Sequence, residues 1–142
     1  MTHRALGIFF ARATLGLMFL MTGIFRVFQM GAVEHAQRFF VGPYAETFLP
    51  GWSLWLAGTT VPFVELVAGA LMLVGFRVRE AAMGIGGVLL VVTFGHLLTE
   101  PFFAFDGHVM PRLLLLLVVL LVPREEDQFS VDAALRKVSA VH

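Results

Sequence analysis

Four long apolar stretches, separated by shorter polar segments, dominate the chain. A helix rises about 1.5 Å per residue, so roughly 20 apolar residues cross the hydrocarbon core of a bilayer. The apolar residues run continuously and do not alternate with polar ones, which argues against a β-barrel. The pattern predicts an all-α, integral membrane four-helix bundle with spans over about residues 5–28, 54–74, 81–98 and 107–122.

The three connections differ in kind. The first, residues 29–53, has room for a short interfacial helix around 33–40 and a turn-rich return in the first outer loop. The second is a tight turn at 75–80. The third, residues 99–106, contains Pro101 and leads into the fourth and shortest span, roughly 24 Å long as a helix.

The character of the chain changes after Pro123. Residues 124–142 are polar, with apolar residues spaced on one face of a helix that Ser130 is placed to cap. We therefore expect two units: a transmembrane bundle over residues 1–123 and a cytoplasmic polar tail, partly an amphipathic helix, over 124–142.

Basic residues set the expected orientation. In the loops of one side only Arg38 is basic, whereas the other side holds six basic residues: Arg4, Arg77, Arg79, Arg124, Arg136 and Lys137. Cytoplasmic loops carry the excess of basic residues in membrane proteins. The distribution predicts that both termini are cytoplasmic in a multi-pass protein of the cell inner membrane.

Composition supports lipid as the main partner. Hydrophobic residues make up 58% of the 142 residues and charged residues 14%, too few to cover a soluble domain of this size. The formal net charge is zero, so no overall basic field favours nucleic acid. The chain has no cysteine, which excludes disulfides, thiolate catalysis and iron–sulfur ligation by its own residues.

Five ionisable residues interrupt the apolar stretches: Arg12, Arg26, Glu65, His96 and Arg112. A charged residue at mid-membrane costs about 2.5–3.5 kcal/mol on insertion scales. In the first two spans the charges share a helical face with glycines, with steps of three and four residues, as in Arg12, Gly16, Phe19, Gly23, Arg26 and in Gly58, Pro62, Glu65, Gly69, Met72. Glycines allow close helix packing in lipid, so we expect this stripe to face the bundle interior.

The depth of these residues suggests one polar region. Arg26, Glu65, His96 and Arg112 fall in the outer half of the bundle, where they can converge. Arg12 lies nearer the cytoplasmic end, where its side chain either snorkels to the headgroups or forms hydrogen bonds within the bundle.

Two interpretations of the polar region remain open. Glu65 with Arg26 or Arg112 can be a buried ion pair that fixes helix register and has no chemistry. Alternatively the region is a pocket for a polar headgroup such as that of a quinone, or for an anionic lipid or oxyanion. In that case Glu65 and His96 are the candidate catalytic residues, which move a proton, and Arg26, Arg112 and Arg12 are the candidate ligand-binding residues.

A metal or haem is not expected. His96 and Glu100 have the i, i+4 spacing of a ligand pair, and His35, Asp106 and His108 fall on the same side. However, Pro101 disfavours a helical Glu100. A single histidine inside a span does not provide two axial haem ligands.

Several short motifs resemble the DoxX-like family of small membrane proteins, which includes the small subunit of thiosulfate:quinone oxidoreductase. The similarity covers roughly residues 8–122 and depends on Arg12 with Gly23-Ile24-Phe25-Arg26 in the first span, on Pro62 and Glu65 with Leu73-Val74-Gly75-Phe76-Arg77 in the second, and on His96. Family members usually have lysine at the position of Arg26, which keeps the charge but changes the donor geometry. The resemblance implies four helices and association with membrane redox chemistry beside a protein partner.

The resulting hypothesis is a subunit or accessory of a membrane oxidoreductase system with a quinone-binding pocket in its outer half. The alternative is a structural or assembly subunit without chemistry, which docks a larger protein or a second copy through its glycine faces or its tail. A third class, a small transporter or lipid-binding module, is disfavoured because four spans without an inverted repeat leave little room for alternating access.

Overall fold

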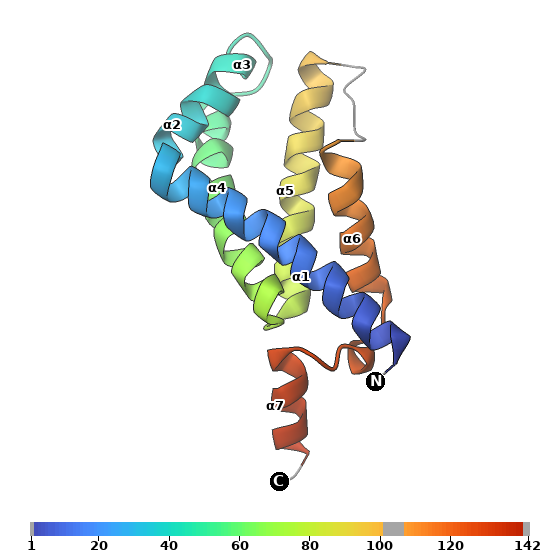
Figure 1. Cartoon of the computed structure of the whole chain (residues 1–142). Coiled ribbons are helices and arrows are strands. Elements are labelled where there is room, and N and C mark those ends of the chain that lie inside the picture. Colours follow the sequence, from blue (N-terminus) through green and yellow to red (C-terminus); the bar gives the residue numbers. More distant parts are fainter. Residues whose placement is uncertain (1, 101–106, 141–142) are drawn as a thin grey trace.

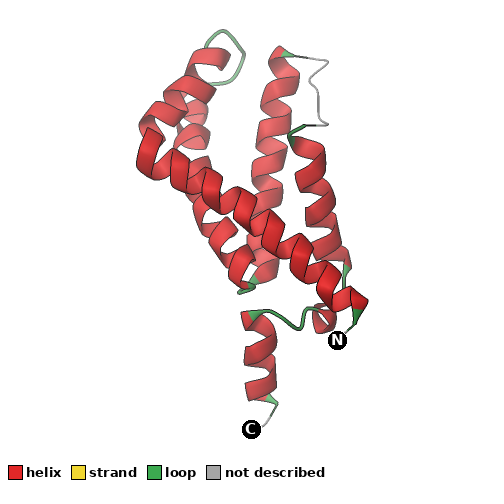
Figure 2. Ribbon diagram, viewed as in Figure 1, coloured by secondary structure: helices red, strands yellow, loops and turns green. Residues whose placement is uncertain are grey.

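The computed structural model describes residues 2–100 and 107–140, and this part of the chain is helical without strands (Figures 1 and 2). Helix α1, His3–Ile24, continues into a wider π-helical segment, η1, at Phe25–Met30. Helices α4, Gly51–Val74, and α5, Val78–Thr99, follow after the first loop, and α6 spans Val109–Leu121. The predicted loop at 99–106 lies almost wholly outside the described residues.

Three of these helices are long and apolar enough to cross a membrane: α1 with η1, α4 and α5. These three helices contain the predicted spans 5–28, 54–74 and 81–98. Helix α6 has only 13 residues, about 20 Å of helix, and is shorter than the predicted span 107–122. It stops at Leu121 because Val122 precedes Pro123, which disfavours helical geometry, and Val122 is extended at φ −77°, ψ 131°.

Helices α1 and α4 form the most extensive interface of the bundle, and glycines bring them together. A Cβ atom added at Gly16, Gly23 or Gly69 would lie within 3.0 Å of the backbone of the facing helix. The predicted packing of the glycine stripe is therefore confirmed. The remaining core is apolar, with Leu15 and Phe19 of α1 buried against Met72, Ile85 and Leu116.

The first loop is helical over the predicted region 33–40 and beyond it. Helix α2, Ala32–Ala36, runs into π-helical η2, Gln37–Val41, and then into the single turn α3, Gly42–Tyr44. Gly31, at φ +89°, makes the sharp turn out of η1. We call residues 32–44 the cap segment.

The polar tail folds back onto the bundle. It begins with a 3₁₀ turn, Arg124–Glu126, and ends with α7, Val131–Ser139, whose predicted cap is confirmed by the Ala133 N–H that donates to Ser130 Oγ at 3.1 Å. The Asp132 carboxylate accepts the backbone N–H groups of Arg77 and Val78 at 3.0 and 3.2 Å. The tail thus supplies acceptors to free N–H groups at the start of α5.

Arg12 joins α1, α4 and the tail. It is 1% exposed, and its Nη1 donates to the carbonyls of Met72 and Leu73, both at 2.8 Å. Its Nη2 donates to the Phe129 carbonyl at 2.7 Å, and its Nε lies 3.3 Å from Asp127 Oδ2. Of the two expectations for Arg12, hydrogen bonding within the protein is confirmed and snorkelling is wrong, because the tail covers the guanidinium.

The bundle has two distinct ends (Figure 1). The start of α1, the turn between α4 and α5, and α7 lie together at what we call the Gly75 end. The cap segment and the end of α5 lie at the other, which we call the Tyr44 end.

The close approach of α1 and α4 predicts different costs for two Gly→Ala changes in helices. Gly69→Ala places a methyl group against the backbone of Leu20 and should lower the free energy of unfolding by about 1–3 kcal/mol. Gly87→Ala is the matched control, because no atom lies within 4 Å of its added Cβ. Unfolding in mixed detergent micelles measures both, and equal stability of the two variants would contradict this packing.

Candidate functional site: a cavity at the Tyr44 end

A cavity of about 460 Å³ lies between the cap segment, α4 and α5. Its walls are mainly aromatic and aliphatic, with Phe39 and Phe40 from the cap segment, Leu54 and Val61 from α4, and Phe94 from α5. Seven polar side chains share the lining: Arg26, His35, Tyr44, Ser53, His96, Thr99 and Glu100. An apolar cavity with a few polar groups, of this size, is the usual form of a small-molecule site.

Arg26 is held by Glu65. The Glu65 side chain is 5% exposed, and its two carboxylate oxygens lie 2.7 and 2.8 Å from Arg26 Nη1. The guanidinium also lies over the Phe39 ring, 5.9 Å from its centroid. Within the described residues, Nη2 and Nε of Arg26 have no hydrogen-bond acceptor. Glu65 therefore neutralises and orients Arg26 while part of its donor set stays available at the cavity.

His35 is a buried neutral acceptor. It is 1% exposed, and its Nδ1 lies 2.7 Å from the carbonyl oxygen of Gly58. A carbonyl only accepts, so Nδ1 carries the proton and Nε2 keeps a lone pair. Burial lowers the pKa of His35, against the raising effect of the Gly58 hydrogen bond, and the charge of Arg26 lowers it further. The neutral imidazole is thus suited to accept a hydrogen bond through Nε2 at neutral pH.

The approach of α2 to α4 explains this position. A Cβ added at Gly58 would lie 2.6 Å from Ala36 Cα, so only glycine lets the cap segment approach this closely. The imidazole then packs against Phe39 and Phe40, with ring centroids 5.2 and 5.7 Å apart.

Tyr44 covers the other side of the cavity, against α5. Its ring occupies the space beside Gly95, where an added Cβ would lie 2.9 Å from the tyrosine oxygen. Burial raises the pKa of Tyr44, more than its hydrogen bond with Thr99 lowers it, and the nearby Glu100 carboxylate raises it further. The phenol therefore stays protonated and can act as a donor.

The five residues singled out in the sequence do not all meet here. Arg26 and His96 line the cavity, and Glu65 supports Arg26 from α4. Arg112 does not line it, since its guanidinium donates to the His108 carbonyl in its own helix, within Coulombic range of Glu65 and Arg26. Arg12 lies at the Gly75 end, where its hydrogen bonds are made inside the fold. We therefore do not retain Arg112 and Arg12 as ligand residues of this cavity.

Sequence reasoning missed His35 and Tyr44 as site residues. The predicted interfacial helix contained a usable signal, because His35 and Phe39 are one turn apart and share a face. The sequence did not show that this face packs against Gly58 of α4.

The expectation that Pro101 keeps Glu100 out of helical geometry is confirmed. Glu100 ends α5 in a non-helical conformation at φ −130°, ψ 85°. Within residues 2–100 and 107–140, no three His, Asp or Glu side chains lie close enough together to hold a metal ion. Asp106 lies outside the described residues.

Comparison with known proteins identifies the family. The family model described as DoxX matches residues 7–97, which include most of α1, the cap segment, α4 and most of α5. The chain therefore belongs to the DoxX family. No curated protein and no solved structure matches the chain.

The lowered pKa of His35 predicts a specific pH dependence of stability. As pH falls below its ordinary pKa of 6.5, the unfolded chain takes up a proton that the folded chain still refuses, so stability should fall. His35→Asn keeps a donor near Gly58 but does not titrate, so its stability should fall less between pH 7.5 and 5, the window around that value. Thermal unfolding of both proteins across this range measures the difference, and parallel curves would contradict a buried neutral His35.

Proposed function

We propose that this member of the DoxX family is a subunit or accessory of a membrane oxidoreductase system, and that the cavity at its Tyr44 end binds the headgroup of a quinone. The observation that carries the proposal is the combination of groups around one cavity. Aromatic walls suit a flat ring, Arg26 offers donors to a carbonyl oxygen, and His35 offers a neutral acceptor. A pure helix-packing role would require none of these groups to line a cavity.

The residues suit both oxidation states of such a headgroup. A quinone, when bound, supplies two-electron, two-proton redox chemistry. Arg26 would donate to a ring carbonyl oxygen, with its charge balanced by Glu65. His35 Nε2 would accept a hydrogen bond from a ring hydroxyl, and His96 at the end of α5 would hold a proton beside the ring. The electrons would come from a protein partner.

The proposal includes the membrane topology. Helix α6 packs against both α1 and α5 and completes the bundle, so we propose that it is a fourth crossing. Local thinning of the bilayer or snorkelling at its ends would accommodate its 13 residues. The basic residues of the Gly75 end would then face the cytoplasm, with both termini, and the cavity would open toward the outer leaflet of the inner membrane.

The alternative is a structural or assembly subunit that docks a partner through its glycine faces or its tail, and the first of these surfaces is already covered. The glycine faces cannot dock a larger protein in this conformation, because Gly16, Gly23 and Gly69 are occupied by the α1–α4 interface. Helix α7 remains, with Val131, Leu135 and Val138 exposed. An assembly role through α7 is compatible with quinone binding at the opposite end.

Quinone affinity of the purified protein in lipid nanodiscs tests the proposal. A double variant, Arg26→Gln with Glu65→Gln, removes both charges without leaving one buried and unpaired. It should bind a short-chain quinone roughly tenfold more weakly, the size of a lost charged hydrogen bond. His96→Asn and Glu65→Gln alone should also weaken binding. Affinities are expressed per mole fraction of quinone in the lipid, because quinones partition into bilayers.

Arg38→Gln is the matched control. Arg38 lies on the cap segment and contacts the same Phe39 ring, at 5.7 Å, but does not line the cavity. It should bind quinone like the original protein. Folded variants that all retain full affinity would reject the quinone site and favour a structural ion pair.

A further inference from the structure

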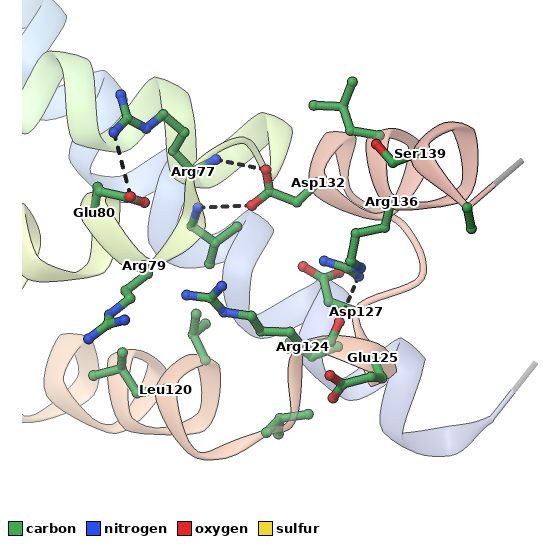
Figure 3. A pocket seen from close by; sticks show the side chains of 16 residues that line it. Arg77, Arg79, Glu80, Leu120, Arg124, Glu125, Asp127, Asp132, Arg136 and Ser139 are labelled. Atoms are coloured by element: carbon green, nitrogen blue, oxygen red, sulfur yellow. Dashed lines mark hydrogen bonds and ion pairs between the residues drawn. The ribbon is translucent and has the colours of Figure 1, made fainter. Parts of the chain in front are cut away.

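A second cavity lies at the Gly75 end, where no part of the proposed quinone site reaches. It has a volume of about 1120 Å³ and lies between the α4–α5 turn, the end of α6 and the tail (Figure 3). Four arginines from three separate segments line it: Arg77, Arg79, Arg124 and Arg136. The carboxylates of Glu80, Glu125, Asp127 and Asp132 share the lining, so the cavity is not basic by composition.

The pairing of these groups leaves positive charge unmatched. Asp127 is committed to Arg12, and Asp132 to the backbone N–H groups at the start of α5. Glu80 lies 3.5 Å from Arg77. Of the four lining carboxylates only Glu125 is left, against the three guanidinium groups of Arg79, Arg124 and Arg136.

These three guanidinium groups differ in what they contact. Arg136 donates to the backbone carbonyl of Arg124 at 2.8 Å, a contact that leaves its charge unbalanced. Within the described residues, the side chains of Arg79 and Arg124 have no hydrogen-bond or ion-pair partner. Figure 3 shows the Arg124 side chain reaching toward Arg79, with Leu120 of α6 beside them. Two free guanidinium groups at one cavity favour an oxyanion, which planar guanidinium binds with paired hydrogen bonds.

The same cavity has an apolar wall. Val119, Leu120 and Val122 from the end of α6 line it, together with Ile8 of α1. The wall continues outward along α6, where Leu121 is 78% exposed and Leu117 is 41% exposed. An inorganic anion would gain nothing from this surface, whereas an acyl chain would cover it.

The position along the helices matches the headgroup level of a membrane. Arg77 comes three residues after α4 ends, Arg79 is the second residue of α5, and Arg124 comes three residues after α6 ends. Basic pockets between helix ends at this depth bind anionic headgroups.

We propose that the Gly75-end cavity binds one anionic phospholipid. Arg79 and Arg124 hold the phosphate oxygens, Arg136 adds charge from α7, and an acyl chain lies along the exposed leucines of α6. The bound lipid would bridge α5, α6 and the tail. This site is independent of the proposed quinone cavity, at the other end of the bundle, and either can exist without the other.

Native mass spectrometry of the delipidated protein tests the proposal with phosphatidylglycerol as the anionic lipid and phosphatidylcholine as the neutral one. The protein should retain one phosphatidylglycerol molecule in preference to phosphatidylcholine. Arg79→Gln and Arg124→Gln should each weaken this binding about fivefold, the equivalent of about 1 kcal/mol per basic residue at a membrane surface. Neither substitution removes a hydrogen bond seen among residues 2–100 and 107–140, where both side chains lack partners.

Lys137→Gln is the matched control, because Lys137 is exposed on the same helix as Arg136 but does not line the cavity. It should retain full lipid binding. Inorganic phosphate in excess should not displace the lipid, because it lacks the acyl chain. Equal retention of the two lipids, an equal loss in Lys137→Gln, or displacement by phosphate alone would overturn the proposal.

Discussion

A buried charge in a lipid-embedded bundle has no water to solvate it, so its partner must come from elsewhere in the chain. The first membrane-crossing segment carries two charges that are buried wholly or in part, Arg12 in α1 and Arg26 in η1, and the rest of the structure is arranged around them. Arg26 meets a carboxylate of α4, whereas Arg12 meets carbonyls of α4 and a carboxylate of the tail. Both contacts require α1 and α4 to lie very close, which glycines at the interface allow. The glycines at the interface are therefore what allows both arginines to reach their partners.

The two arginines show how exposure separates a structural role from a candidate binding role. The Arg12 side chain is 1% exposed, and hydrogen bonds and an ion pair surround it, so no donor is left in reach of a ligand. The Arg26 side chain is 27% exposed, and its ion pair uses one terminal nitrogen. Its remaining donors lie beside an aromatic cavity that also holds a buried neutral histidine. Arginine thus joins α1, α4 and the tail at the Gly75 end and lines a cavity at the Tyr44 end.

Much of this was predictable from local patterns, and the rest depends on contacts between distant segments. Apolar runs located α1, α4 and α5, and the three-and-four spacing placed Glu65 and Gly69 on the face toward α1. The pairing of Arg12 with Asp127 could not be predicted, because no periodicity links residues so far apart and the tail looked like an independent polar segment. His35 was missed for the same reason, since its role depends on Gly58 across the interface. The predicted fourth span was longer than helix α6. Apolar residues continue to Val122, but Pro123 keeps Val122 out of the helix.

Locating a bound quinone shows whether the Tyr44-end cavity holds its headgroup. An azido-quinone photolabel, used in nanodiscs with and without excess unlabelled quinone, followed by peptide mapping, gives its position. If the headgroup binds there, label that competes with unlabelled quinone is expected on the cap segment, residues 32–44, and on the α5 stretch 91–99. Label spread over lipid-facing positions such as Phe10, Leu90 and Leu121, without competition, would contradict it.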